Sequence, residues 1–511
     1  MTTHIVELPL KTTKYDDYMI NKRFFAMWSL HNILVKHAKK MLEQLNQNKR
    51  YKELRSQYGT LMKKEKLSDE ETALKKILSA EMNAILQSLK LSEYDFQAYL
   101  KVAGKRVNHM LSSTQVQKEA TFVWRGVEKV LFSNGKSIHF KKFIDMNIIS
   151  GKIATNGVEF DKGTRSIDWL GLHINCKFPK ELHNDNKPTE YDYVTESLNH
   201  TVKFCEIKRR MFNNGWHYYL LIYLDGQAPA KLSVGTDTMG IDPGVSTIAG
   251  VGDNHLVLRE LVPKSKDYNK KISKLQNRMN ISIRNSNANN FNSDGTIKKG
   301  KHKWTFSKTY EKNRRKLKTL YRQKSEYIKH SHNALCNELI KHHNTFIVEA
   351  MNFSSLQKRA KNTKRQENVS TIRQKDGSVK LVHKCQKKKR FGKSINDRSP
   401  ELFLSILEQK CKAYGATYKE VDTMKLRASQ YNHDTDSYEK VPLGCREKVI
   451  GGQKVQRDLY SAFIIRYVNK NLSTVNKKKC KDNFDKFLKL QNVLIESMKT
   501  NHISMKQCFG F

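Results

Sequence analysis

The chain has 511 residues, with 94 Lys and Arg against 50 Asp and Glu, so its formal charge is +44. Hydrophobic residues make up 38%, which excludes a wholly disordered chain because enough apolar surface exists to build cores. The longest apolar run, Tyr218–Leu224, is far shorter than the roughly 20 residues that cross a bilayer, which excludes a membrane-spanning protein.

The positive charge is spread along the whole chain. Such a charge repels itself and destabilises a compact fold unless a polyanion offsets it. The sequence therefore predicts a nucleic-acid partner, with a merely basic enzyme as the alternative. The N-terminal region carries Asp16 and Asp17 and lacks the apolar segment of a signal peptide, and the eight Cys include no CxxC pair. These features predict a cytoplasmic protein with mostly buried free thiols.

The N-terminal half is predicted to be a helical region between strand regions. His4–Leu10 alternates apolar and polar residues, as an edge strand does. From Tyr18 to Val107, apolar residues recur at helical spacing and Gly and Pro are almost absent, which predicts long helices. From Thr121 to Leu224, strand-like runs such as Trp169–Cys176 alternate with turn signals such as Asn156–Gly157, which predicts an antiparallel barrel or sandwich. The first strand can join it, which makes the helical region an insertion.

A different pattern begins at Gly235. Met239–Val251 predicts a strand, a tight turn and a second strand, and Asn254–Leu261 predicts a third strand. A Lys-rich helical region follows, broken by a polar loop at Asn285–Asp294. Three later helices are predicted at Lys301–His343, Ser399–Tyr414 and Val455–Asn469. Two strands are predicted between them, at Thr345–Met351 and Ala416–Val421. A strand meander followed by alternating helices and strands is typical of an RNase H-like α/β domain.

Basic residues are densest between Gln357 and Lys393, where apolar residues are few. The two main groups are Lys358, Arg359, Lys361, Lys364 and Arg365, and then Lys387, Lys388, Lys389 and Arg390. They predict a mobile segment that faces nucleic acid, and the alternative is a solvated loop without a ligand. Four Trp residues can likewise either stack on bases or belong to cores, namely Trp28, Trp124, Trp216 and Trp304.

Three acidic residues stand next to apolar segments. Asp242 ends a short apolar strand and opens a Pro-Gly turn, Glu349 ends a second strand, and Asp458 lies early in an amphipathic helix. Carboxylates at the ends of buried strands are costly unless cations offset their charge. Carboxylate oxygens suit Mg²⁺, and divalent cations promote phosphodiester cleavage. We therefore predict that these three side chains form a metal-dependent catalytic site.

Each of these residues also has a plain structural explanation. Asp242 can belong only to a turn, Glu349 can be a solvated strand end, and Asp458 can favour the helix dipole. Asp237 is a rival carboxylate, which ranks lower because it precedes the apolar strand. The order of the three residues in a strongly basic chain favours the catalytic interpretation.

Four segments resemble the TnpB family, the RNA-guided nucleases of insertion sequences. The segments Gly240-Ile-Asp-Pro-Gly244, Phe346-Ile-Val-Glu-Ala-Met-Asn352 and Gln456-Arg-Asp-Leu-Tyr-Ser-Ala-Phe463 are similar to the family's first, second and third RuvC motifs. Ala428-Ser-Gln-Tyr431 resembles the Ser-Gln that precedes the family's zinc-binding cysteines. The four segments occur in family order, and the family in turn resembles the compact type V CRISPR effectors.

The resemblance implies an α/β plus α+β multidomain protein. A β-barrel wedge domain with an inserted helical recognition lobe would precede an RNase H-like RuvC nuclease domain. The expected parts are the first wedge strand (1–14), the helical recognition lobe (15–120), the wedge β domain (121–234), the first part of the RuvC domain with helical and basic segments (235–424), a degenerate zinc-finger-like segment for target loading (425–454), and the last part of the RuvC domain with a C-terminal tail (455–511).

The resemblance also implies an activity. Asp242, Glu349 and Asp458 would bind Mg²⁺, or Mn²⁺ in its place, and cut double-stranded DNA that pairs with a guide RNA. The protein would recognise a short DNA motif beside the target. It would act in a prokaryotic cytoplasm, and no membrane partner is expected. Two alternatives stay open: a guide-RNA-dependent DNA-binding repressor that does not cut, and a RuvC-like resolvase that needs no RNA.

One departure from the family pattern concerns zinc. Family members carry a four-cysteine zinc site between the second and third motifs, whereas residues 432–453 offer only His433, Asp434, Asp436 and Cys445. One Cys and one His do not make a tetrahedral structural site, so no zinc is expected. The segment is expected to keep its shape through His433 and a turn at Leu443–Gly444.

Overall fold

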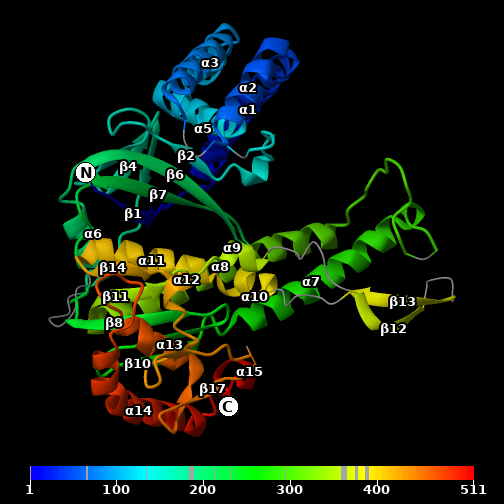
Figure 1. Ribbon diagram of the computed structural model, residues 1–511. Helices are drawn as coiled ribbons and strands as arrows, with labels where there is room; N and C mark the ends of the chain where they lie inside the picture. Colours follow the sequence, from blue (N-terminus) through cyan, green and yellow to red (C-terminus); the bar gives the residue numbers. More distant parts are fainter. Residues whose placement is uncertain are drawn as a thin grey trace. The chain divides into compact units, whose positions relative to one another are not determined.

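The chain divides into two compact units, Met1–Lys231 and Leu232–Phe511 (Figure 1). The computed structural model describes residues 2–64, 67–133, 135–182, 189–212, 214–230, 232–293, 295–357, 365–373, 378–385, 391–442 and 444–511. Both units combine helices and sheets, which agrees with the predicted mixed α/β class. The predicted division into wedge, recognition-lobe and RuvC parts stays a prediction.

The first unit contains a four-stranded antiparallel sheet of order β1-β7-β6-β2. Its strands are β1 (Thr3–Pro9), β2 (Ile148–Ser150), β6 (Val202–Phe212) and β7 (Gly215–Asp225). β1 is an edge strand, as predicted, and it pairs with β7 along its whole length. The helices between β1 and β2 are therefore an insertion into this sheet.

A second sheet in this unit joins β3 (Glu159–Asp161), β4 (Ser166–Trp169) and β5 (Leu172–Asn175). The predicted strand Trp169–Cys176 therefore begins too early, because Leu170 and Gly171 adopt positive φ and turn the chain between Trp169, the end of β4, and β5. A bridge between Leu10 and Cys176 links the two sheets. The described strands do not close into the predicted barrel, since the three-residue edge strands β2 and β3 are not paired with each other.

The helices of the first unit begin at well-formed caps. Thr13, Ser68, Ser112 and Thr189 each form a capping box with the residue three positions later. The helices are α1 (Lys14–Gln47), α2 (Lys49–Leu61), α3 (Asp69–Ser88), α4 (Glu93–Gly104), η1 (Lys105–Val107), α5 (Ser113–Phe132), η2 (Phe143–Asp145) and α6 (Glu190–Ser197). The prediction of β structure from Thr121 was wrong, because α5 continues to Phe132 with Val123 and Val127 buried one turn apart.

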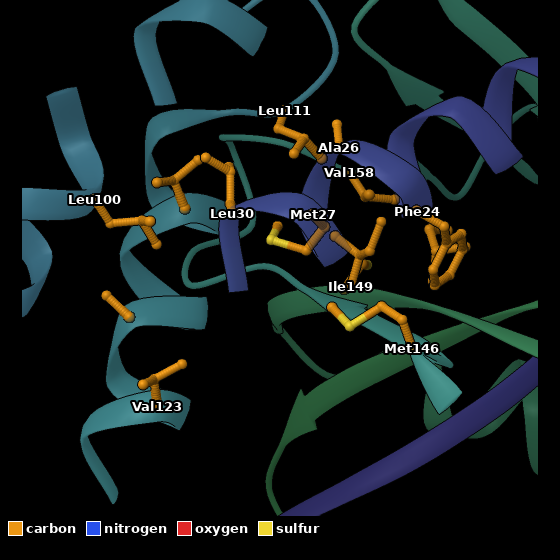
Figure 2. Close-up of a cluster of buried hydrophobic side chains, with 14 of the residues drawn as sticks. Phe24, Ala26, Met27, Leu30, Leu100, Leu111, Val123, Met146, Ile149 and Val158 are labelled. Carbon is orange, nitrogen blue, oxygen red and sulfur yellow. The ribbon is translucent and has the colours of Figure 1, made fainter. Parts of the chain in front are cut away.

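The core of the first unit forms where α1 packs against α4, α5 and β2 (Figure 2). Phe24, Met27 and Leu30 are 0–3% exposed and lie at helical spacing along α1. Figure 2 shows Met146 and Ile149 on one side of α1, and Leu100 and Val123 beyond Leu30 on another. The inserted helices and the sheet therefore share one hydrophobic core.

The second unit is built on a five-stranded sheet of order β10-β9-β8-β11-β14. Its strands are β8 (Asp237–Pro243), β9 (Thr247–Val251), β10 (Leu256–Glu260), β11 (His343–Glu349) and β14 (Thr417–Val421). The first three form an antiparallel meander, and β11 and β14 are parallel to β8. These strands lie where the sequence predicts them, in the predicted order.

Helices cover both faces of this sheet. Figure 1 shows α8 and α11 on one side and α13 and α14 on the other. The helices of the unit are α7 (Ser265–Ser286), η3 (Ala288–Asn290), α8 (Lys308–His342), α9 (Phe353–Gln357), α10 (Gly392–Arg398), α11 (Pro400–Tyr414), α12 (Thr423–Leu426), α13 (Arg457–Arg466), α14 (Lys477–Thr500) and α15 (Lys506–Phe509). The predicted C-terminal tail thus contains α14, a 24-residue helix.

Three small hairpins complete the second unit. They are β12 (Arg365–Arg373) with β13 (Val379–Cys385), β15 (Tyr431–Asn432) with β16 (Ser437–Tyr438), and β17 (Glu447–Ile450) with β18 (Gln453–Gln456). The first hairpin lies inside the basic tract, for which the sequence predicted no strands. Its local signal is weak: Val379, Leu381 and Val382 favour a strand, but apolar and polar residues do not alternate regularly to Cys385.

The cysteines of the described residues form no disulfide. Five of them are buried, as expected of free thiols in a core: Cys176, Cys205, Cys336, Cys411 and Cys480. Among the helices of the described stretches, none is both long and apolar enough to span a membrane.

Candidate active site

Asp242 and Glu349 are neighbours on two parallel strands. The β8–β11 ladder pairs Ile241 with Val348, so the next residue on each strand is one of the two carboxylates. Ile241 and Val348 are fully buried in the core beneath α8 and α11. Because strand side chains alternate between faces, Asp242 and Glu349 point to the opposite face, where α13 lies. The two carboxylates are close enough for the charge of Glu349 to raise the pKa of Asp242.

Helix α13 crosses that face of the sheet at very short range. A Cβ atom on Gly240 would lie 2.2 Å from the Ala462 carbonyl oxygen and 2.4 Å from the Arg466 backbone nitrogen. Only glycine at this position lets the helix approach so closely. This contact sets α13 against β8 and brings its first turn, which carries Asp458, near Asp242. The charge of Asp458 accordingly acts on Asp242.

The start of α13 is fixed by its own cap. The Gln456 side chain accepts a hydrogen bond of 2.7 Å from the Leu459 amide, as an N-cap residue does. The Gln456 amide in turn donates to Gln491 of α14 at 2.8 Å. The second turn of α13 places Ser461, which is fully buried, toward Asp242. Asp458 is therefore held on a rigid element rather than on a loop.

Burial dominates the electrostatics of the three carboxylates. Burial raises the pKa of Asp242 well above its usual range, and the charges of Glu349 and Asp458 raise it further, while the Ser461 hydroxyl opposes the rise. Burial also raises the pKa of Glu349 and of Asp458. Three carboxylates in such a place disfavour their shared negative charge, and a cation among them would offset it.

Arg446, on the loop before β17, is a protein cation beside this group. Its Nη1 lies 3.4 Å from both carboxylate oxygens of Asp458 and lowers the pKa that burial raises. The two side chains are only 23% and 19% exposed. Arg446 lies in the segment predicted to be zinc-finger-like, and no local feature of that segment predicts a contact with Asp458.

The donor set fits Mg²⁺ by chemistry, because three carboxylates on two strands and a helix offer hard oxygen ligands. Ser461 Oγ, buried beside them, makes no hydrogen bond of ordinary geometry, although its dipole acts on Asp242. Within the described stretches, no three His, Cys, Asp or Glu side chains are spaced to hold a metal ion together. Asp458 would therefore have to turn from Arg446 toward Asp242 to complete such a site.

The turn that follows Asp242 is anchored from α10. Ser394 Oγ lies 2.6 Å from Ser246 Oγ and donates to the Val245 carbonyl at 3.1 Å. Arg398, one turn further along α10, donates to Ser394 at 3.2 Å and pairs with Glu260 at the end of β10. Sequence reasoning did not find Ser394, because its partners lie about 150 residues earlier in the chain.

Asp237, the rival carboxylate, lies at the other end of β8. It is five positions from Asp242, which is about 16 Å along the strand. Its oxygens already have partners: Arg466 at 3.0 Å, His343 at 3.3 Å and the Asp253 amide at 2.5 Å. The structure therefore does not bring Asp237 to the three candidate residues.

The segment predicted to be zinc-finger-like, residues 425–454, packs onto α13. His433 is 2% exposed, and its Nδ1 lies 2.8 Å from the Tyr460 hydroxyl. Burial lowers the pKa of His433, whereas Cys445 is exposed. His433 thus contributes to the shape of the segment, as expected, while Leu443 lies outside the described residues.

The other binding predictions have mixed outcomes. The basic side chains predicted to face nucleic acid, from Lys358 to Arg365 and from Lys387 to Arg390, lie outside the described side chains. Trp28 donates to the Lys141 carbonyl at 2.7 Å, and Trp216 lies under Arg209 at 4.1 Å. These two rings belong to the interior contacts of the first unit. Trp124 contacts Phe96, and Trp304 contacts Phe291.

Comparison with known proteins gives a structural likeness. No protein-family model and no curated protein matches the chain. A cryo-EM structure of a Cas12f1–sgRNA–target DNA complex is similar at 13% identity and a TM-score of 0.43, over 93% of this chain and 99% of that chain. A CRISPR-Cas12f ternary complex is similar at 10% identity and a TM-score of 0.25, over 92% and 100% of the two chains.

A third similar structure is a Cas12i1 R-loop complex after target DNA cleavage. Its identity is 10% and its TM-score 0.25, over 95% of this chain and 64% of that chain. The chain is thus similar in structure, at low sequence identity, to Cas12f and Cas12i proteins.

Proposed function

We propose that this chain is an RNA-guided DNA endonuclease of the TnpB type, with a Mg²⁺-dependent RuvC site. The observation that supports the proposal best is the placement of Asp242 and Glu349 side by side on parallel strands, with the charge of Asp458 acting on Asp242 from α13, in a chain of charge +44. The motif resemblance assigns catalysis to the same three residues. The second unit would be the RNase H-like nuclease domain, and the first unit would hold the wedge and recognition lobe.

Each protein group has a defined part in the proposed reaction. Asp242 and Glu349, held side by side by the β8–β11 ladder, would hold Mg²⁺, and Asp458 would complete the site from α13. When bound, Mg²⁺ would supply the Lewis acidity and charge neutralisation that phosphodiester hydrolysis needs. Ser461 would orient the Asp242 carboxylate, and the anchored turn after Asp242 would keep that carboxylate in place.

Specificity would come from the guide RNA. In this proposal, base pairing between the guide and one DNA strand selects the target, while the protein binds the duplex by shape and backbone. The net charge of the chain supports a large nucleic-acid cargo, because only a polyanion offsets so many cations. Guide RNA and target DNA would therefore share the basic surfaces.

To test the proposal, the RNA that co-purifies with the protein is sequenced. The complex is then incubated with a plasmid library that contains the matching target, and cleavage is measured. Mg²⁺-dependent cuts at guide-matched sites are expected for the wild type and not for Asp242→Ala, which should still bind RNA. A complex without any enriched RNA would refute the guided function and would favour the RNA-independent resolvase.

A second candidate is a guide-dependent DNA-binding protein that does not cut. The contact of Arg446 with both oxygens of Asp458 favours it, since an ion-paired carboxylate is less available to a metal. The same library distinguishes the two candidates. Guide-dependent protection of target DNA without cuts would replace the nuclease by the repressor.

A further inference from the structure

The second unit carries a long basic arm formed by α7 and α8. The two helices run antiparallel, because Tyr268 pairs with Tyr327, Gln276 with Tyr321, and Ser282 with Ser307. Residues 265–342 contain 20 Lys and Arg and five Asp and Glu. Figure 1 shows the two helices side by side along much of their length. The arm therefore carries a far larger share of positive than negative charge.

The tip of the arm, residues 287–307, is folded rather than loose among its described residues. Asn287 is 8% exposed, accepts a hydrogen bond from the Thr305 amide at 2.7 Å and donates to the Thr305 carbonyl at 2.8 Å. Asn290 donates to the Lys303 carbonyl at 3.0 Å. A bridge between Phe291 and Ile297 closes the turn. The tip can thus hold side chains in fixed positions.

Two aromatic rings stack where the tip joins α8. The rings of Phe306 and Tyr310 lie 4.7 Å apart and are tilted by only 20°. Phe306 is 45% exposed, so one part of its ring is accessible from solvent. Three exposed lysines precede it closely in the sequence, namely Lys299, Lys301 and Lys303. The tip therefore combines an accessible ring with a group of cations.

This combination fits unpaired nucleotides better than a duplex. In a double helix the faces of the bases are covered by their neighbours, so a protein ring stacks only on a base that is unpaired or splayed out. Lysines spaced along the chain contact the phosphates of the same strand. Among the partners of the proposed function, guide RNA is the one that stays bound between DNA targets. It can therefore offset the charge of the arm permanently.

We infer that the tip of the α7–α8 arm binds unpaired nucleotides of RNA, with Phe306 stacked on a base and Lys299, Lys301 and Lys303 on phosphates. The inference rests on the proposed function only for the identity of the RNA as a guide. The surface itself is defined by its charge and its exposed ring.

The test measures binding of a short fluorescent oligouridylate RNA to the full-length protein after its own RNA is removed at high salt. Phe306→Leu keeps the apolar bulk and removes the ring, so affinity should fall about 5- to 150-fold, the range for the loss of one base–aromatic stack. Phe306→Tyr keeps the ring and should bind as the wild type does. Tyr94→Leu, which likewise replaces an 83% exposed ring of the first unit by an apolar side chain, is the matched control and should bind as the wild type does.

The lysines are tested by the salt dependence of the same binding. Replacing Lys299, Lys301 and Lys303 by Gln should lower the log–log salt slope by about 2, because each phosphate contact on a single strand contributes about 0.7. The same change at three exposed lysines of α14, namely Lys478, Lys479 and Lys481, should leave the slope unchanged. Thermal unfolding of each variant checks that the tip substitutions leave the fold intact.

The outcomes separate this inference from the proposed function. If the wild type binds its guide RNA and the Phe306 and lysine variants bind oligouridylate equally well, the tip is not an RNA site, although the guided function stands. The inference would also be overturned if the Phe306 and lysine variants lost affinity for duplex RNA or for single-stranded DNA more than for oligouridylate. If the wild type binds no RNA, both proposals fail.

Discussion

Replacement of Gly240 by Ala tests how the candidate site is assembled. The added Cβ would lie 2.2 Å from the Ala462 carbonyl oxygen, 2.4 Å from the Arg466 amide nitrogen and 2.8 Å from its Cα. All three atoms belong to the backbone of α13, so no side chain can rotate away. Real Cβ contacts are at least 3.0 Å, so the helix must move by about 0.8 Å or more relative to β8.

This displacement should lower both the free energy of unfolding and the rate of cleavage, and the two effects can be measured separately. Overpacking of this kind costs about 1–3 kcal/mol of unfolding free energy. Asp458 rides on the displaced helix, and a misplacement of about 1 Å at a catalytic group lowers the rate by up to about 100-fold. Gly240→Ala should therefore slow single-turnover cleavage of a guide-matched plasmid more than it lowers RNA binding.

The control for this experiment is Gly59→Ala. No atom lies within 4 Å of a Cβ at Gly59 in α2, and Ala is the better helix former, so stability should hold or rise slightly. The reasoning is refuted if Gly240→Ala cuts at the wild-type rate. A lower thermal midpoint with unchanged cleavage would show that the position of α13 does not control the site.

Three further predictions concern the surroundings of the site. Ser394→Ala removes the hydrogen bond to the Val245 carbonyl and should slow cleavage several-fold, with a stability loss of about 1 kcal/mol in urea unfolding. Gln456→Ala removes the cap of α13 and should lower the free energy of unfolding by about 0.5–2 kcal/mol in the same assay. Burial lowers the pKa of His343, beside Asp237, from 6.5 to about 4, so the unfolded state binds the proton more tightly. As the pH is lowered from 6.5 to 4, the free energy of unfolding should therefore fall by up to about 3 kcal/mol. In His343→Gln, the urea midpoint should change less over the same pH range.

The sequence predicted the second unit better than the first. The meander near Asp242 has strong local signals, because apolar alternation and a Pro-Gly turn determine strands and their connection. The turn at Leu170–Gly171 was missed because Leu170 rarely adopts positive φ, which left Gly171 as a single turn signal within an apolar run. The end of α5 was missed because the predicted β region began at Thr121, although the first turn signal, Asn134–Gly135, comes after the helix.

The site itself could be predicted only in part. Asp242, Glu349 and Asp458 stand out because each follows an apolar or amphipathic segment. Gly240, Ser394 and the partner of Asp458 did not, because their roles depend on contacts between segments far apart in the chain. Such contacts follow from tertiary packing, which residue spacing alone does not encode.

The measurement that tests the central claim most directly is cleavage of a guide-matched plasmid by the purified complex, with Mg²⁺ and with EDTA. The wild type should cut only with Mg²⁺ and a matching guide. Asp242→Asn and Glu349→Gln, which keep shape and remove charge, should bind RNA and target but not cut. Cleavage that persists in either variant would contradict the assignment of these carboxylates to the catalytic site.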